Sequence, residues 1–246
     1  MKVEKSAIRQ RILAQRRALP PVALAAAGEA VFNALRSMAE YWTAGAVVSY
    51  VAHDNEVPTG HVLRDVNRSG RLVYLPLTKG APGFRSWQSN AAWTKGIGGV
   101  PELIGQPEPL PDCPTVILLP LVGWSEEGGR LGRGGGFYDR MLASKTEQAV
   151  LIGLAYEFQK VLAMPSEPWD VGLDYVITQL RIIRCAAPGD ARRSSEEGVT
   201  NHNGLIDPDW RTGASGRSGG ALRDVSASPD SPADSERRGN SAENSR

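Results

Sequence analysis

The hydrophobic positions of this chain follow a helical period in some segments and form short, nearly continuous runs in others. Residues 2–19 and 22–40 carry apolar side chains at helical spacing, and the second segment opens after two prolines, which suit the first turn of a helix. Further helices are predicted for residues 59–70, ending near a glycine, and for residues 137–145. Six apolar segments have the length and composition of strands: 46–51, 71–77, 83–88, 115–122, 149–158 and 175–178.

The order of these segments predicts the class of fold. The runs at 115–122 and 149–158 are almost entirely apolar, as expected of central strands that are buried on both faces. Strands that alternate with helices predict an α/β fold with a mostly parallel sheet. Because ligands of such sheets bind beyond the carboxyl ends of the strands, the segments that follow the strands are the expected location of a functional site.

The composition of the chain changes near Arg184. Residues 185–246 are rich in Ser, Gly, Pro, Asn, Asp, Glu and Arg. Their large apolar side chains are Val199, Leu205, Ile206, Trp210, Leu222 and Val225. Such a segment cannot bury enough apolar surface to offset the entropy lost on ordering. We therefore predict a single domain over residues 1–184 and a disordered tail over residues 185–246.

Composition and charge narrow the possible functions. The 246 residues are 41% hydrophobic and 22% charged, which is ordinary for a soluble globular protein. A net charge of +1 argues against bulk attraction to nucleic acids or membranes. Cys113 and Cys185 lack the spacing of a metal or redox motif and suit a reducing compartment. No apolar run reaches membrane-spanning length, so we expect a cytoplasmic protein, and a monomer.

The stretch "LGRGGGFYDR" at residues 131–140 predicts an anion site. Its four glycines can expose main-chain N–H groups to a ligand, and they precede the predicted helix at 137–145, whose amino terminus favours negative charge. Arg130 and Arg133 could add phosphate contacts. The stretch is neither a Walker A loop nor a G-x-G-x-x-G fingerprint. A flexible surface turn is the alternative reading of the glycines alone.

Other charged positions fall where a ligand could meet them. On the first helix Lys5, Arg9 and Arg16 lie within about 40° of one another, beside an apolar edge formed by Ile8, Ile12 and Leu19. This basic stripe could reach over a polyphosphate, although such stripes are more often solvated faces. Glu56 follows the first predicted strand and is either a ligand contact or a surface carboxylate.

Two aspartates are candidate metal ligands. Asp139 and Asp170 could share a magnesium ion together with water and phosphate oxygens. Their alternative role is to cap helices or turns, where most loop aspartates belong.

Taken in order, these segments resemble the 5-formyltetrahydrofolate cyclo-ligase (methenyltetrahydrofolate synthetase) family. The resemblance runs from about Lys5 to Arg184. Its motifs are "KSAIR", "EVPT", "VPE", "LLPLVGW", "GGRLGRGGGFYDR", "IGLAYEFQ" and "EPWDVGLDYVIT". It implies a Rossmann-like α/β domain with helices on both faces of the sheet. It also implies ring closure of 5-formyltetrahydrofolate to 5,10-methenyltetrahydrofolate, with ATP as co-substrate, Mg²⁺ as cofactor, and release of ADP and phosphate.

The resemblance also implies roles for individual residues. The metal ligands would be Asp139 and Asp170, and the catalytic residues Lys5 and Arg133. The ATP contacts would be Lys5, Arg9, Arg130, Leu131, Gly132, Arg133, Gly134, Gly135, Gly136, Phe137 and Tyr138. The contacts to the folate would be Val51, Glu56, Arg133, Gly134, Gly135, Gly136 and Phe137.

The chain departs from the family pattern at two places. Trp124 and Ser125 stand where members often have Phe-Asp, and Gly98 stands where some members have an aromatic residue that lines the folate pocket. Two alternatives therefore stay open: a divergent member that acts on another substrate, such as a thiamine-related compound, and a non-catalytic module that binds ATP or folate. The two aspartates and Glu56 favour an enzyme over such a module.

Overall fold

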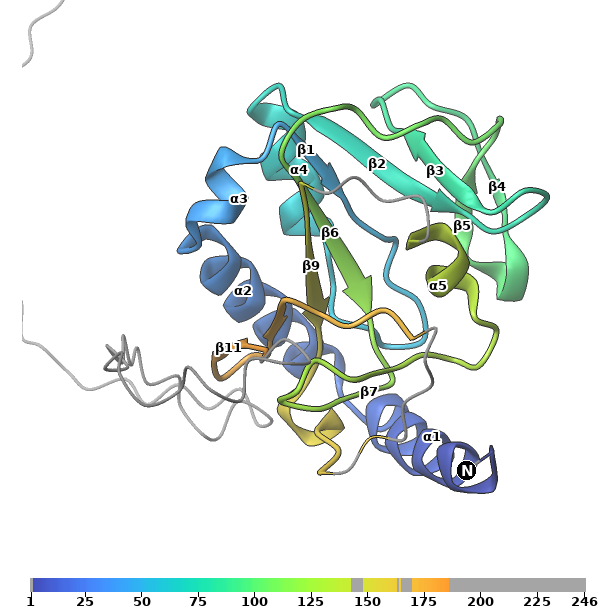
Figure 1. Cartoon of the computed structure of the whole chain (residues 1–246), viewed down its shortest axis with the longest axis vertical. Helices are drawn as coiled ribbons and strands as arrows, with labels where there is room; N and C mark the ends of the chain where they lie inside the picture. The colour runs from blue at the N-terminus through green and yellow to red at the C-terminus, as the bar shows by residue number, and fades with distance from the viewer. Residues whose placement is uncertain (1, 143–147, 163, 165–169, 186–246) are drawn as a thin grey trace, which may run out of the picture. The chain divides into compact units, whose positions relative to one another are not determined.

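The computed structural model describes residues 2–142, 148–162, 164 and 170–185. The predicted tail lies outside the described residues, apart from Cys185. Helices connect strands as the sequence pattern predicts where α4 follows β1 and precedes β2, and where α5 follows β8 and precedes β9 (Figure 1).

Seven strands form one mixed sheet in the order β11-β10-β9-β6-β1-β2-β3. Their bounds are β1 Ala46–Val48, β2 Leu72–Leu77, β3 Gly83–Ser86, β6 Thr115–Pro120, β9 Ala149–Leu154, β10 Tyr175–Ile177 and β11 Ile182–Arg184. The five inner strands are parallel, and the edge strands β3 and β11 pair antiparallel to their neighbours. The mostly parallel α/β sheet is confirmed, and the carboxyl ends of its inner strands lie along one edge.

The described helices are α1 Lys2–Arg17, α2 Pro21–Arg36, α3 Ala39–Thr43, α4 Gly60–Arg68 and α5 Phe137–Leu142, with 3₁₀ turns η1 Ile97–Gly99 and η2 Glu157–Gln159. The single helix predicted for 22–40 is wrong, because α2 ends at Arg36 and α3 starts after a break. The Ser37 hydroxyl donates to the carbonyl of Ala34 at 2.7 Å, and Met38 is extended. Serine often forms such local bonds in place of continued helix. No single helix in the described part of the chain is long and apolar enough to cross a membrane; α1 and α2 reach that length and composition only as a pair bent by 105°.

The sheet is buried on both faces, as its apolar runs predict. Along β6, Val116 and Leu118 belong to the core that α2, α3 and α4 cover, whereas Ile117 and Leu119 belong to the core on the opposite face. Consecutive residues of a strand point to opposite faces, so an uninterrupted apolar run fills both cores. Met141 of α5 and other residues of that helix pack into the second core, and helices therefore lie on both faces (Figure 1).

The strands are shorter than the apolar runs that predict them. β1 ends at Val48, although the run continues to residue 51, and β9 ends at Leu154 before η2 begins. Beyond these points the chain turns into loops at the carboxyl edge of the sheet. Tyr50 stays buried there, and its hydroxyl donates to the carbonyl of Val57 at 2.9 Å. Apolar character in these segments reflects burial under the loops rather than strand pairing.

Two small hairpins were not predicted. β4 Trp93–Lys95 pairs with β5 Pro101–Leu103, and β7 Gly123–Trp124 pairs with β8 Arg130–Leu131. Strands of two or three residues are too short to show a period in the sequence. The second hairpin ends where the glycine-rich stretch begins, so it carries that stretch over the edge of the sheet.

Helix α1 docks at this same edge through its apolar side. Ile12 is fully buried and forms a small core with Val122 and Val161, against which Ile8 also packs. The predicted apolar edge of this helix is therefore its docking face. The docking places α1 beside β7, which follows β6 in the chain (Figure 1).

Candidate functional site

A cavity of about 1170 Å³ opens at the carboxyl edge of the sheet. Segments from α1, the loop after β1, the end of β2, η1, β5 and the residues around β8 and α5 line it. Every residue to which the family resemblance assigns a role lines this one cavity: Lys5, Arg9, Val51, Glu56, Arg130, Leu131, Gly132, Arg133, Gly134, Gly135, Gly136, Phe137, Tyr138, Asp139 and Asp170. Segments separated by more than a hundred residues thus meet at one place.

The glycine-rich loop, residues 132–136, connects β8 to α5. Gly134 and Gly136 have φ angles of 101° and 59°, which residues with a β-carbon rarely adopt. The Nε of Arg9 donates to the carbonyl of Gly132 at 2.8 Å, and this bond ties α1 to the loop. The loop therefore presents an almost bare main chain to the cavity.

The basic stripe of α1 faces the protein and is not a solvated face. The Lys5 Nζ lies 3.6 Å from the Asp170 Oδ2 and, like Arg9, lines the cavity. The Arg16 side chain is only 1% exposed and donates to the carbonyl of Leu121 at 3.2 Å. Two cations of the stripe, Lys5 and Arg9, thus line the cavity, whereas the third, Arg16, is buried outside it.

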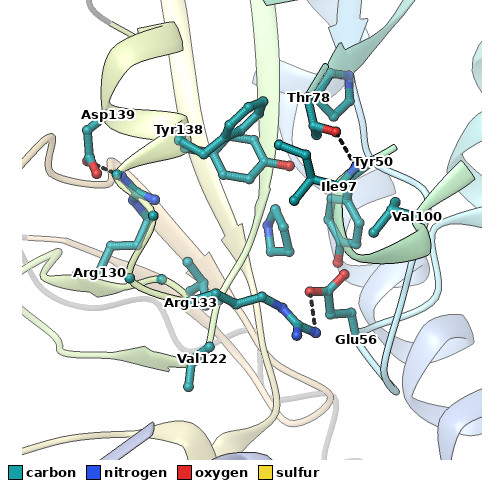
Figure 2. A pocket seen from close by; sticks show the side chains of 18 of the residues that line it. Tyr50, Glu56, Thr78, Ile97, Val100, Val122, Arg130, Arg133, Tyr138 and Asp139 are labelled. Atoms are coloured by element: carbon teal, nitrogen blue, oxygen red, sulfur yellow. Dashed lines mark hydrogen bonds and ion pairs between the residues drawn. The ribbon is translucent and has the colours of Figure 1, made fainter. Parts of the chain in front are cut away.

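Glu56 is a largely buried acid on the opposite wall from Arg130 and Asp139 (Figure 2). Its side chain is 12% exposed, its Oε2 accepts from the main-chain N–H of His53 at 3.1 Å, and its Oε1 lies 3.6 Å from the Arg133 guanidinium. Burial raises the pKa of Glu56, whereas the charges of Arg16 and Arg133 oppose that rise. The reading of this residue as a surface carboxylate is wrong.

The two candidate metal ligands both line the cavity and both pair with cations. Asp139 binds Arg130, whose side chain is 5% exposed, and Asp170 pairs with Lys5. Within the described ranges, no group of three or more His, Cys, Asp or Glu side chains is arranged to hold a metal ion. A cation beside these two aspartates would therefore need further ligands from water or from a bound phosphate.

The far wall of the cavity is largely apolar, and most of it was missed in the sequence. It consists of Tyr50, Leu75, Pro76, Ile97, Val100 and Pro101, together with Thr78 and Glu102. Gly98 lies between Ile97 and Val100 in the chain and has a φ of 69°. The space around it is open, since no described heavy atom lies within 4 Å of the position that a β-carbon would take. The hairpin β4–β5 brings this wall to the cavity, and its short strands carry no signal of their own.

The second departure from the family pattern lies in the β7–β8 hairpin. Trp124 is fully buried, and its indole N–H donates to the carbonyl of Tyr156 at 3.2 Å. The Ser125 hydroxyl accepts from the N–H of Gly129 at 3.2 Å. These side chains hold the hairpin that carries the glycine-rich loop.

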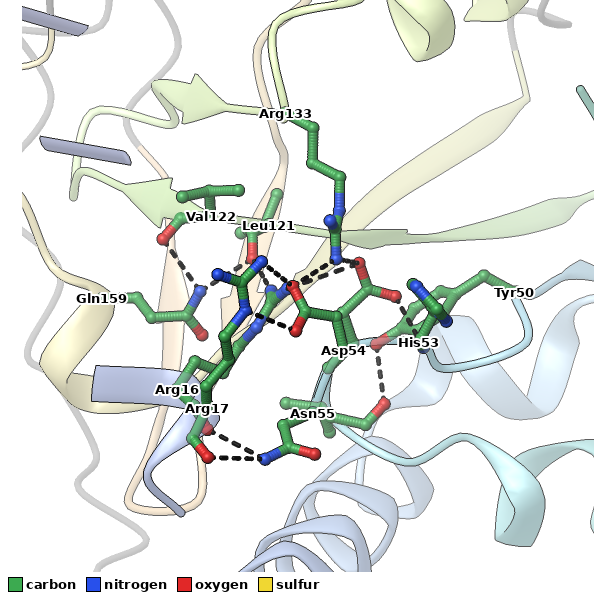
Figure 3. Close-up of polar contacts among 12 residues, drawn as sticks. Arg16, Arg17, Tyr50, His53, Asp54, Asn55, Leu121, Val122, Arg133 and Gln159 are labelled. Atoms are coloured by element: carbon green, nitrogen blue, oxygen red, sulfur yellow. Dashed lines mark hydrogen bonds and ion pairs between the residues drawn. The ribbon is translucent and has the colours of Figure 1, made fainter. Parts of the chain in front are cut away.

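A network around Asp54, another residue that the sequence did not single out, joins the end of α1 to Arg133 of the glycine-rich loop (Figure 3). The Asp54 Oδ2 accepts hydrogen bonds from Arg133 at 3.0 Å, from Arg17 at 3.1 Å and from Arg16 at 3.4 Å. The Arg17 Nε donates to the other carboxylate oxygen at 2.8 Å. The hydrogen bonds from Arg17, and the charges of Arg133 and Arg16, lower the pKa of Asp54 to about 2, against the opposing effect of burial.

The lowered pKa predicts a specific loss of stability in acid. The unfolded chain protonates Asp54 near its ordinary value of 3.8, whereas the folded chain does so only near 2, so the ionised carboxylate favours the folded state above that window. We expect the free energy of unfolding of the wild type to exceed that of Asp54→Asn near neutral pH. The difference should shrink as the pH falls from about 4 to about 2. Urea titrations across this range measure it, and a pH-independent difference would contradict the assignment.

Comparison with known proteins places this chain in a family. The family model of the 5-formyltetrahydrofolate cyclo-ligase family matches residues 1–179. The 5-formyltetrahydrofolate cyclo-ligase of Escherichia coli is 32% identical over 186 residues, which cover 71% of this chain and 98% of that protein. The NMR structure of the 5,10-methenyltetrahydrofolate synthetase of Aquifex aeolicus is similar with a TM-score of 0.66 and 27% identity, over 80% of this chain and 98% of the other.

The synthetase from Mycoplasma pneumoniae gives a TM-score of 0.56 and 25% identity, over 71% of this chain and 98% of the other. The family model covers all of the residues that line the cavity. This chain belongs to the 5-formyltetrahydrofolate cyclo-ligase family of enzymes.

Proposed function

We propose that this chain closes the ring of 5-formyltetrahydrofolate to 5,10-methenyltetrahydrofolate at the expense of ATP, with release of ADP and phosphate. The observation that carries the proposal is the cavity itself, which joins the glycine-rich loop and the cations of α1 to Glu56 and an apolar wall. Family membership and the names of the relatives support the same activity.

The two sides of the cavity suit two different ligands. Bare main chain at residues 132–136, with Lys5, Arg9 and Arg130 around it, suits a polyphosphate. Ile97 and the other apolar residues of the far wall suit a flat, partly apolar ring system, and Glu56 offers a carboxylate to its polar edge. A volume of about 1170 Å³ exceeds the usual range of pockets for one small ligand, so nucleotide and folate can lie side by side.

Arg133 lies between these two sides. Its guanidinium extends from the glycine-rich loop toward Glu56 (Figure 2). A cation at the junction can contact the group that moves from one ligand to the other, which supports the assignment of Arg133, with Lys5, to catalysis.

The chemistry needs positioning and charge neutralisation more than a protein nucleophile. The formyl oxygen of the folate attacks the γ-phosphorus, and the bond from that phosphorus to the oxygen bridging to ADP breaks. The nitrogen at position 10 then attacks the activated carbon and loses its proton, and the carbon–oxygen bond breaks to release phosphate. Lys5, Arg9 and Arg133 would neutralise the charge on the phosphoryl oxygens during this sequence.

Asp139 and Asp170 would hold Mg²⁺. Carboxylate oxygens are the ligands that this ion prefers, and one or two of them suffice when phosphate and water complete the shell. Both side chains line the same cavity as the glycine-rich loop, so the donor chemistry fits. When bound, the ion supplies further neutralisation of phosphate charge. The cationic partners of the two aspartates, Arg130 and Lys5, would then turn to the phosphates.

One assay separates this function from its alternatives. Purified protein with 5-formyltetrahydrofolate and ATP should produce the absorbance of the methenyl product, and the product should not form when ATP is omitted. ATP hydrolysis that depends instead on another substrate would indicate a divergent member of the family. Binding of either ligand without turnover would indicate a non-catalytic module.

The cations of α1 should act on the nucleotide. We expect Lys5→Ala and Arg9→Ala to raise the KM for ATP by about tenfold or more, with a smaller effect on the KM for the folate, because each would lose a charged hydrogen bond to phosphate. Steady-state kinetics with each substrate varied in turn measures both constants. Arg11→Ala is the matched control, since Arg11 lies on the exposed side of the same helix. A rise confined to the KM for the folate would assign the stripe to the other ligand.

A further inference from the structure

Asp54 lies where three guanidinium groups from two distant segments meet. Arg16 and Arg17 end helix α1, and Arg133 belongs to the glycine-rich loop, yet all three donate to the same Asp54 oxygen. Arg133 is among the described residues that line the cavity, whereas Asp54 contacts it from outside that set. It can therefore influence a ligand only through the cations that it holds.

The segment that carries Asp54 is fixed from behind. The Asn55 side-chain amide donates to the carbonyls of Arg16 at 3.1 Å, Arg17 at 3.4 Å and Leu19 at 3.5 Å, and so caps the end of α1. The Asn55 carbonyl in turn accepts from the Tyr156 hydroxyl at 3.1 Å. Asp54 and Asn55 have φ angles of 51° and 57°, an uncommon conformation that Asp and Asn tolerate best. These contacts hold the Asp54 carboxylate in one place.

Arg133, in contrast, lies in a loop made otherwise of glycines. Glycines stand on both sides of it, and its side chain is 44% exposed. Its ion-pair partners are Asp54 at 3.0 Å and Glu56 at 3.6 Å. A long side chain on such a loop needs an external partner to hold one geometry, and Asp54 is the nearer of the two.

The charges also require Asp54 to be a carboxylate. Arg16 and Arg133 approach the same two acids, Asp54 and Glu56. Burial lowers the pKa of Arg16, and the positive charge of Arg133 adds to that lowering. A carboxylate between two guanidinium groups offsets their repulsion. If Glu56 turns toward a bound folate, Asp54 remains as the anion that keeps Arg133 near the buried Arg16.

We propose that Asp54 is a positioning residue, which holds the Arg133 guanidinium at the junction of the polyphosphate and folate sides of the cavity. The proposal rests on the proposed function for its effect on catalysis. The Asp54–Arg133 contact itself does not depend on that function and can be measured without substrate.

The first test replaces the carboxylate by an amide of the same size. Asp54→Asn should lower kcat about ten- to a hundredfold, because displacement of a catalytic group by about 1 Å can cost a hundredfold. In the ligand-free protein, the ¹⁵Nε–¹Hε NMR signal of Arg133, assigned by its loss in Arg133→Lys, should shift or broaden in Asp54→Asn. An unchanged signal would overturn the proposal.

A double variant tests whether Asp54 acts through Arg133. Turnover of Asp54→Asn/Arg133→Ala should equal that of Arg133→Ala alone, while the losses in melting temperature of the two changes add. If Asp54 had only a structural role, the fold-loss in turnover of the double variant would equal the product of the fold-losses of the two single variants. That result would overturn the proposal. Should Asp54→Asn destabilise the fold, Asp54→Glu is the second variant, because it keeps the negative charge near Arg16. Turnover of Asp54→Glu/Arg133→Ala should then also equal that of Arg133→Ala alone.

Arg17→Ala is the matched control. It removes the bond to Asp54 from the exposed side of α1, where Arg17 is 60% exposed, and leaves the Arg133 contact in place. Turnover and the Arg133 signal should stay near those of the wild type. A loss equal to that of Asp54→Asn would assign the effect to the end of α1 and overturn the proposal. Absence of methenyl product from the wild type would refute the proposed function only, and the NMR signal would still decide the role of Asp54.

Discussion

Asp139→Asn and Asp170→Asn should each lower ATP-dependent turnover about a hundredfold or more while the fold stays intact. Each change removes a negative charge from the cavity that the glycine-rich loop also lines. If the two carboxylates share Mg²⁺, the loss follows from a weaker hold on an ion that neutralises phosphate charge. Turnover at increasing Mg²⁺ concentrations, together with the melting temperature, measures the effect. Partial recovery at high Mg²⁺ is the expected signature.

The ion pairs of these aspartates define the competing outcome. Asp139 binds Arg130 and Asp170 pairs with Lys5, so purely structural roles would lower the melting temperature and leave the Mg²⁺ dependence unchanged. Glu127→Gln is the control for loss of an acid nearby, because Glu127 is exposed in the turn of the β7–β8 hairpin. Near-normal turnover with unchanged Mg²⁺ dependence in both aspartate variants would refute the metal assignment.

Arg133→Ala should cause a loss of similar size, at least a hundredfold in kcat. Its guanidinium extends from the glycine-rich loop toward Glu56, at the proposed junction of nucleotide and folate. Removal of one preorganised group that stabilises transition-state charge costs on the order of a hundred- to a thousandfold. The side chain is 44% exposed, so the melting temperature should change little.

Arg133→Lys distinguishes charge from geometry. Lysine keeps the positive charge but cannot form paired hydrogen bonds from a rigid fork, so we expect it to recover only part of the lost kcat. Arg68→Ala, which removes an exposed guanidinium at the end of α4, should match the wild type. If Arg133→Ala raises only the KM values and leaves kcat unchanged, Arg133 binds ligands and takes no part in the chemical step.

The long elements of the fold could be predicted because their signals repeat over many residues. The run at 115–122 contains β6, and alternate side chains of that strand fill opposite cores. The burial of the strand can therefore be predicted from its unbroken run of apolar residues. The helix at 59–70 was also found, and the chain beyond α4 passes through Gly70 at a φ of 72°. The break at Ser37 was missed, because a local hydrogen bond of one side chain decides it.

The site divides in the same way between local and long-range signals. The glycine-rich loop, Glu56 and the basic stripe carry unusual residues in a recognisable order. The structure brings the loop, Glu56 and two of the three stripe residues, Lys5 and Arg9, around one cavity. Their catalytic and binding roles stay predictions. The apolar wall around Ile97 and the network at Asp54 have no such signal, since each depends on partners far away in the chain.

By itself, the sequence determined the class of fold, the family, and which residues could carry charge or expose a bare backbone to a ligand. These properties belong to single segments, where periodicity, composition and motif order suffice. Only the tertiary structure decided that the stripe of α1 faces inward, that Glu56 is buried, and that one carboxylate at position 54 joins three arginines. These contacts join side chains that lie far apart in the sequence and meet only when the helix packs against the sheet. A local sequence pattern therefore cannot predict them.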